Sequence, residues 1–170
     1  MSKRILVVDD EIDTLRLLKT ILEISGYEAY TTLNSLEALT LAQVEQPDVV
    51  LLDIMMPKLD GFQLCKMMRA HPTTQLLPII FVTAYDALDL EDRRRSSGGD
   101  MVLHKPINMD SLIQAIEVVE KLERNIPDDI RTASEGIAPV NGKGTSVVPE
   151  SNGKPHDPTI NPPNPHPPSV

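Results

Sequence analysis

Acidic, hydroxyl and basic side chains follow four separate apolar segments of this 170-residue sequence. Asp9 and Asp10 follow the first segment, whereas Asp53, Thr83 and Lys105 follow three later ones. Three carboxylates at close quarters raise one another's pKa unless a cation joins them. Oxygen ligands favour a hard ion, and Mg²⁺ binds few protein carboxylates because it keeps several waters. If the segments end side by side, they predict a Mg²⁺ site with Asp10 and Asp53 as direct ligands and Asp9 as a ligand directly or through water.

A carboxylate beside such an ion, with an ammonium and a hydroxyl group nearby, suits phosphoryl transfer. Asp53 would attack phosphorus as the nucleophile and become an acyl phosphate. The metal would neutralise charge on the transferring group, and Lys105 and Thr83 would hold its equatorial oxygens. Taken singly, each residue has an ordinary interpretation, since Asp-Asp after a strand is often a turn or a helix cap. Their coincidence at four segment ends favours the chemical interpretation.

Hydrophobic periodicity predicts the elements that position these side chains. Short apolar runs without alternation, typical of strands buried on both faces, alternate with amphipathic segments. The predicted strands are 4–8, 28–32, 49–52, 78–82 and 101–104, and the predicted helices run from Ile12 to a stop at Gly26, from a cap at Asn34 to a stop at Pro47, over 62–69, over 86–97, and from a cap at Asn108 through Leu122. The pattern predicts an α/β fold, a flavodoxin-like doubly wound parallel sheet with strand order 2-1-3-4-5. In that order the polar side chains converge at the carboxyl edge of the sheet.

The helix predicted over 86–97 is weak. Leu88 and Leu90 are its only large apolar residues, and the run 93–95 consists of three arginines, which we interpret as a solvated face rather than a partner contact. The Ser-Ser-Gly-Gly sequence at its end is expected to fray. In the second helix, Leu36, Leu39 and Ala42 are expected to form the apolar face.

Composition divides the chain near residue 125. Ten of the 15 prolines follow residue 126, and every aromatic residue precedes it. We therefore expect a globular domain over 1–125 and a disordered Pro-, Gly- and Asn-rich tail over 126–170 with no effector domain. A net charge of −9 and a pI of about 4.8 argue against direct nucleic-acid or membrane-surface binding. No apolar run has the length of a membrane span, so we expect a cytoplasmic protein without membrane insertion.

These motifs together resemble the receiver domain of bacterial two-component response regulators of the stand-alone, chemotaxis-regulator-like kind. The matching segments are 7–11, 51–61, 80–84 and 105–106, and the resemblance extends over about residues 3–124. It implies that Asp53 is the phosphoacceptor and takes its phosphoryl group from a histidine kinase or a histidine phosphotransfer protein. It also implies a Mg²⁺ site formed by Asp9, Asp10, Asp53 and the backbone carbonyl of Met55.

The resemblance assigns roles to five further residues. Thr83 corresponds to the switch hydroxyl, and Lys105 corresponds to the lysine that contacts the phosphoryl group, with a cis peptide bond to Pro106. Pro57 and Gly61 correspond to the loop after the phosphorylation site, where proline fixes φ and glycine permits a tight turn.

One position departs from the family pattern. The family usually has an aromatic residue three positions before the lysine, but this chain has Val102 there. A valine has no long side chain to swing, which calls the usual aromatic switch into question. Because side chains alternate along a strand, Val102 and His104 are expected on the same face as a candidate output surface. Bulky, non-acidic Met55 and Tyr85 at the mouth of the site predict slow self-dephosphorylation, since neither would orient an attacking water.

The leading hypothesis is a single-domain response regulator that signals through changed protein–protein binding. Its candidate surface comprises the fourth helix, the fifth strand and the fifth helix, and its downstream target is a protein of unknown identity. One alternative is a degenerate receiver that acts as a phosphorylation-independent scaffold. A weaker alternative is a Mg²⁺-dependent phosphohydrolase with an aspartate nucleophile, which would normally carry a second Asp at the position of Met55. The leading hypothesis implies no enzymatic activity beyond the chemistry at Asp53 itself.

Overall fold

The computed structural model describes residues 2–122. The proposed tail, 126–170, lies outside the described residues, so its expected disorder stays a prediction. Within 2–122, no helix is long and apolar enough to cross a membrane.

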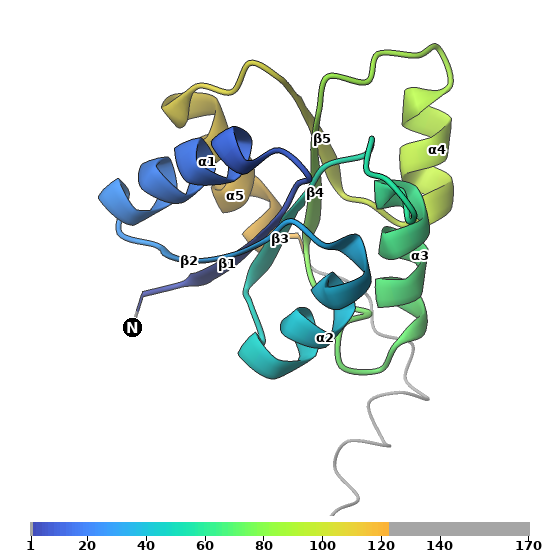
Figure 1. Cartoon of the computed structure of the whole chain (residues 1–170), viewed down its shortest axis with the longest axis horizontal. Coiled ribbons are helices and arrows are strands. Elements are labelled where there is room, and N and C mark those ends of the chain that lie inside the picture. Colours follow the sequence, from blue (N-terminus) through green and yellow to red (C-terminus); the bar gives the residue numbers. More distant parts are fainter. Residues whose placement is uncertain (1, 123–170) are drawn as a thin grey trace, which may run out of the picture. The chain divides into compact units, whose positions relative to one another are not determined.

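Within residues 2–122, five strands and five helices alternate, as the periodicity predicts. The strands are β1 (Arg4–Val8), β2 (Glu28–Thr32), β3 (Val49–Leu52), β4 (Ile79–Thr83) and β5 (Met101–His104), and the helices are α1 (Ile12–Ile24), α2 (Ser35–Glu45), α3 (Gly61–Ala70), α4 (Leu90–Ser97) and α5 (Met109–Glu120). All strand pairs are parallel, in the predicted order β2-β1-β3-β4-β5. The carboxyl ends of β1, β3, β4 and β5 therefore lie along one edge (Figure 1).

Two apolar layers cover the sheet. Side chains alternate along each strand, so Ile5 and Val7 face α1 and α5, whereas Leu6 and Val8 face α2, α3 and α4. All four side chains are almost fully buried. Burial on both faces explains why these strands have no alternating polar residues. The result is a rigid frame for the loops at the carboxyl edge.

Helix α2 packs differently from the prediction. Its buried residues are Ser35, Ala38 and Ala42, and Leu36 is exposed. Small residues four positions apart let the helix approach the sheet closely, so the contact face lies along Ala38 and Ala42 rather than along the larger leucine. The predicted cap is present, since the Asn34 side chain accepts a hydrogen bond from the Leu36 backbone N–H.

Helix α4 begins at Leu90, four residues later than predicted. Leu88 is fully exposed in the preceding loop, so it contributes no apolar contact that would extend the helix. At the other end, Gly98 adopts a left-handed conformation with φ of 85°. The Ser97 side chain is buried, and its backbone carbonyl accepts a hydrogen bond from the Cys65 thiol at 3.2 Å. The end expected to fray is therefore held against α3.

The interpretation of the three arginines as a solvated face is wrong for two of them. The Arg94 guanidinium is 17% exposed and donates hydrogen bonds to the backbone carbonyls of Gly99 and Asp100. The Arg93 guanidinium lies over the Phe62 ring, 4.3 Å from its centroid. Arginine can pack its planar group on a ring or a backbone turn while keeping its charge, and helical periodicity does not reveal this. Arg95 alone projects into solvent, with 70% of its side chain exposed.

Candidate functional site

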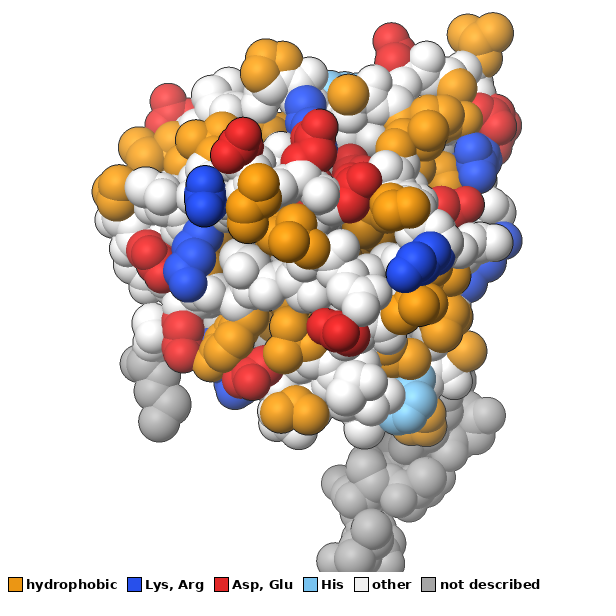
Figure 2. Space-filling view, in the orientation of Figure 1, with side chains coloured by type: hydrophobic (Ala, Val, Ile, Leu, Met, Phe, Trp, Pro, Cys, Tyr) orange, Lys and Arg blue, Asp and Glu red, His pale blue; other side chains and the backbone are white. Residues whose placement is uncertain are grey.

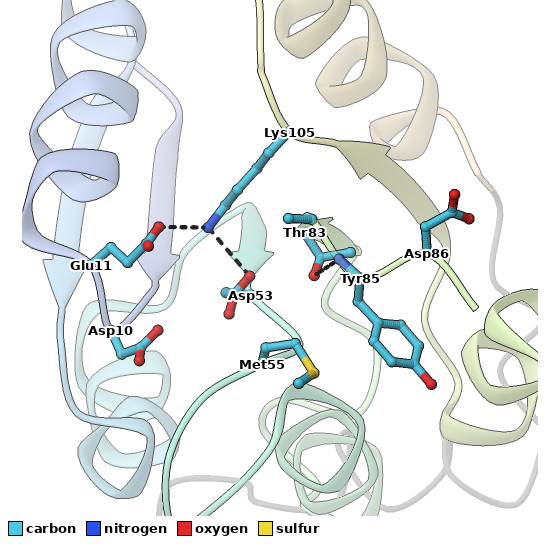
Figure 3. Close-up of a pocket in the computed structure, with 9 residues that line it drawn as sticks. Asp10, Glu11, Asp53, Met55, Thr83, Tyr85, Asp86 and Lys105 are labelled. Carbon is cyan, nitrogen blue, oxygen red and sulfur yellow. Dashed lines mark hydrogen bonds and ion pairs between the residues drawn. The ribbon is translucent and has the colours of Figure 1, made fainter.

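A pocket of about 440 Å³ lies at the carboxyl edge of the sheet. Its lining comes from the loops after β1, β3, β4 and β5, and comprises Asp10, Glu11, Asp53, Met55, Thr83, Ala84, Tyr85, Asp86 and Lys105 (Figure 3). Acidic side chains gather with a basic one at the upper edge of the same face in the space-filling view (Figure 2). The parallel topology thus brings the end of the first strand and the residues after three later strands into one site, as the sequence predicts.

Lys105 connects three carboxylates from two loops. Its Nζ lies 2.8 Å from Oδ2 of Asp9, 3.3 Å from Oε2 of Glu11 and 3.4 Å from Oδ1 of Asp53. Figure 3 shows the lysine side chain extending between Glu11 and Asp53. Glu11 was not predicted as a site residue, although it directly follows the Asp-Asp pair. One ammonium group is therefore shared by three negative groups.

Burial dominates the electrostatics of the two inner carboxyl groups. Asp9 and Asp53 are 1% and 4% exposed. Desolvation raises the pKa of Asp53. The positive charge of Lys105 opposes this increase, and the negative charge of Asp9 adds to it. Desolvation likewise raises the pKa of Asp9, although its hydrogen bond from Lys105 opposes the shift. Burial would lower the pKa of Lys105, but the hydrogen bond to Asp9 and the charge of Asp53 raise it overall. Nearby negative charges more than offset the burial of the Lys105 ammonium group, whereas the single positive charge does not offset the burial of the two carboxylates.

The three carboxylates predicted to bind a metal differ in their position relative to the pocket. Asp10 and Asp53 line the pocket, but Asp9 does not. The Asp9 carboxylate instead accepts hydrogen bonds from Lys105 and from the Glu11 backbone N–H. Within residues 2–122, no three Asp, Glu, His or Cys side chains lie close enough together to hold a metal ion by themselves.

The pocket nevertheless has the donor chemistry of a magnesium site. Asp10 and Asp53 supply carboxylates, and Met55 lies beside them in the lining. Mg²⁺ needs only one or two protein carboxylates because waters complete its octahedral shell. The poorly compensated carboxyl of Asp53, with its raised pKa, would gain from a second cation.

Thr83 lies at the bottom of the pocket. It is fully buried at the end of β4, and its hydroxyl oxygen accepts a hydrogen bond from the Tyr85 backbone N–H at 3.1 Å. Lys105 follows β5 and is joined to Pro106 by a cis peptide bond, as expected. Neighbouring parallel strands therefore place the hydroxyl and the ammonium group on the same side of the pocket.

The loop after β3 depends on Gly61 for a reason other than the predicted one. The positive φ in this loop belongs to Lys58, at 69°, rather than to the glycine. A Cβ at Gly61 would lie 2.2 Å from the backbone oxygen of Asp53. The glycine thus permits close approach of α3 to the site rather than an unusual turn. Pro57 precedes the turn, and Asp60 forms a capping box with Gln63 that fixes the start of α3.

The two candidate output residues on β5 differ in exposure. Val102 is half-buried and packs against the apolar layer that includes Phe81, whereas His104 is exposed. Their position on one face stays a prediction from the two-residue period of the strand. The valine contributes no polar group to the site.

The sequence matches the family model described as the response regulator receiver domain over residues 5–117. This chain belongs to that family. Receiver domains are signalling proteins of two-component systems that use Mg²⁺ at a phosphorylation site and interact with histidine kinases or phosphotransfer proteins.

The relatives differ in how much of their length this receiver domain covers. This chain is 41% identical over 108 residues to the response regulator PleD of Caulobacter vibrioides. The aligned region covers 64% of this chain and 24% of PleD. The chain thus spans about a quarter of that relative. It is 34% identical over 117 residues to the polar-differentiation response regulator DivK of Brucella anthropi, covering 69% of this chain and 95% of DivK.

Solved structures show the same fold. The Vibrio cholerae chemotaxis protein CheY4 has a TM-score of 0.67 and 28% identity, over 70% of this chain and 99% of CheY4. A putative response regulator from Chloroflexus aurantiacus has a TM-score of 0.68 and 29% identity, over 72% of this chain and 100% of the other.

Proposed function

We propose that this receiver domain accepts a phosphoryl group on Asp53. The observation that carries the proposal is the placement of this buried carboxylate in the pocket, 3.4 Å from the Lys105 ammonium. An oxygen of Asp53 would attack phosphorus of a phosphohistidine on a histidine kinase or phosphotransfer protein. The new O–P bond forms as the P–N bond breaks, and the imidazole leaves with the electron pair and takes up a proton.

The surrounding side chains suit the charge that develops in this transfer. Lys105 would turn from Asp9 and Glu11 to an oxygen of the phosphoryl group, and the Thr83 hydroxyl would donate to another. Asp10, Asp53 and the backbone carbonyl of Met55 would hold Mg²⁺, with Asp9 joining directly or through water. When bound, the ion supplies charge neutralisation for the phosphoryl oxygens.

The output of the domain is a change in protein binding. Phosphorylation places about two negative charges at Asp53, a local change that biases neighbouring elements. Thr83 and Lys105 connect the site to the ends of β4 and β5, so the face formed by α4, β5 and α5 would respond. Val102 and His104 lie on β5 at this face and are the candidate contact residues for a protein partner.

The direct test is labelling by a small phosphoryl donor. The purified chain is incubated with acetyl phosphate and Mg²⁺, and its intact mass is measured. We expect a gain of one phosphoryl group in the wild type and none in Asp53→Ala. Asp13→Asn is the matched control, because Asp13 is an acidic residue at the start of α1 with 94% of its side chain exposed. Labelling of Asp53→Ala at the wild-type level would overturn the proposal.

A further inference from the structure

An aromatic and cationic cluster joins the pocket to α4. Tyr85, which lines the pocket, packs edge-on against Phe62 with ring centroids 6.4 Å apart. The Arg93 guanidinium of α4 lies over both rings, 4.3 Å from the Phe62 centroid and 5.6 Å from that of Tyr85. Its Nη1 donates a hydrogen bond to the Tyr85 hydroxyl at 2.9 Å. That hydroxyl donates in turn to Asp89, the residue before α4, at 3.3 Å.

The other end of Tyr85 is tied to the bottom of the pocket. Its backbone N–H donates to the Thr83 hydroxyl oxygen at 3.1 Å. In Figure 3 the Tyr85 ring extends away from Asp53, so its hydroxyl lies at the far side of the residue from the site. A single residue therefore contacts the Thr83 hydroxyl through its backbone and α4 through its side chain.

The neighbouring arginines are committed to other contacts. Arg94 binds Glu91 and the turn that follows α4, and Arg95 binds Glu91 alone. Among the three, Arg93 alone touches a residue that lines the pocket. Arg93 also packs on Phe62, so the hydroxyl of Tyr85, which contacts Arg93 and Asp89, is the more selective place to break the contact.

We propose that the Tyr85–Arg93 contact transmits the state of the pocket to α4. The inference rests on the proposed function, since it requires phosphorylation of Asp53. As the Thr83 hydroxyl turns to a phosphoryl oxygen, its hydrogen bond from the Tyr85 backbone is altered and the ring shifts. Arg93 and Asp89 hold the hydroxyl of that ring, so the start of α4 moves with it. Because coupling between two sites is reciprocal, a protein that binds α4 would also change the affinity of the pocket for its ligands.

The test measures α4 while the phosphorylated fraction is known. Hydrogen–deuterium exchange of residues 90–97 is followed with and without acetyl phosphate and Mg²⁺, and intact mass gives the phosphorylated fraction. We expect exchange in the wild type to change by about tenfold, within the usual range of allosteric coupling. In Arg93→Gln, and in Tyr85→Phe, which removes only the hydroxyl, the change should fall below about twofold at equal phosphorylation.

Arg95→Gln is the matched control, because it removes an arginine from the same helix without touching Tyr85. It should keep the wild-type response. The two substitutions remove the same hydrogen bond. The exchange response of the double variant of Arg93→Gln and Tyr85→Phe should therefore be no smaller than that of either single variant. An undiminished response in Arg93→Gln, or an equal loss in Arg95→Gln, would overturn the inference, as would a phosphorylated wild type with unchanged α4. Absence of phosphorylation in the wild type would instead refute the proposed function, and intact mass distinguishes the two failures.

Discussion

Replacing Asp53 with asparagine should stabilise the metal-free domain at neutral pH. The carboxyl group is almost fully buried, and desolvation raises its pKa in spite of the nearby lysine. The folded structure therefore disfavours the ionised form, and asparagine has nearly the shape of the neutral acid. Lys105 keeps Asp9 at 2.8 Å and Glu11 at 3.3 Å after the change, so no buried cation is left unpaired.

The size of the effect follows from two opposing quantities. The attraction between Asp53 and Lys105 at 3.4 Å amounts to about 5 kcal/mol at an effective dielectric constant near 20. Burial of an ion costs several kcal/mol, and repulsion from Asp9 and Asp10 adds to that cost. The raised pKa of Asp53 means that the unfavourable contributions exceed the attraction, so we expect a net gain in stability that is smaller than either contribution alone.

The pH dependence gives the sign independently. A carboxyl group whose pKa is higher in the folded state binds more protons there, so it destabilises the fold when ionised. For Asp53 this penalty is full above its folded pKa and disappears as the pH falls to the ordinary value of 3.8. On acidification the free energy of unfolding of the wild type should therefore approach that of Asp53→Asn, and the two values should converge near pH 4.

Urea denaturation between pH 4 and pH 8 in EDTA provides the measurement, with Asp13→Asn as a control that should stay within about 0.5 kcal/mol of wild type. Added Mg²⁺ should stabilise the wild type by mass action and stabilise Asp53→Asn much less. A variant less stable than wild type at pH 7 would show that the lysine outweighs burial. A stability difference that is independent of pH would refute the linkage argument.

Three further changes test the loops around the pocket. Gly61→Ala should destabilise the domain by about 2–4 kcal/mol because the added Cβ would lie 2.2 Å from the backbone oxygen of Asp53. Gly26→Ala has no atom within 4 Å of its added Cβ, so it should cost only the backbone strain of about 1–2 kcal/mol. Equal melting temperatures of the two variants would contradict this expectation. Met55→Asn and Tyr85→Glu should each speed loss of the phosphoryl label roughly tenfold by orienting water, and an unchanged or slower rate would count against the shielding hypothesis. Asp10→Asn should raise the Mg²⁺ concentration needed for half-maximal labelling roughly tenfold, and an unaltered Mg²⁺ dependence would remove Asp10 from the metal site.

The strands could be predicted closely because their sequences have one simple physical cause. A strand covered on both faces must be apolar throughout, and the polar residues after it mark its end. The bounds of β1, β2, β3 and β5 match the prediction. β4 begins one residue late because Pro78 has no N–H to donate, although its carbonyl accepts a hydrogen bond from Val50 at 2.9 Å.

The site could be predicted in composition but not in its pairings. Parallel topology brings together the residues that end neighbouring strands, so the proximity of Asp53, Thr83 and Lys105 follows from strand order. Which carboxylates share the lysine depends on rotamers and burial, which a linear pattern does not contain. Arg93 gave no signal at all, because an arginine that stacks on aromatic rings has the same helical spacing as one in solvent.

The unequal charge balance of the pocket suits it for switching. One ammonium group serves Asp9, Glu11 and Asp53, and burial leaves the inner carboxylates poorly compensated. A fully satisfied ion-pair network would have a single preferred arrangement and would resist any change of partners. Here the lysine lies within 3.4 Å of all three carboxylates, so a new anionic partner would compete with three existing ones for a single ammonium group. A phosphoryl group on Asp53, with a divalent ion beside it, would provide both the stronger partner for Lys105 and the missing positive charge for Asp9 and Asp10. On the proposed function, this exchange of partners at Lys105 would be the change that reaches the adjacent ends of β4 and β5.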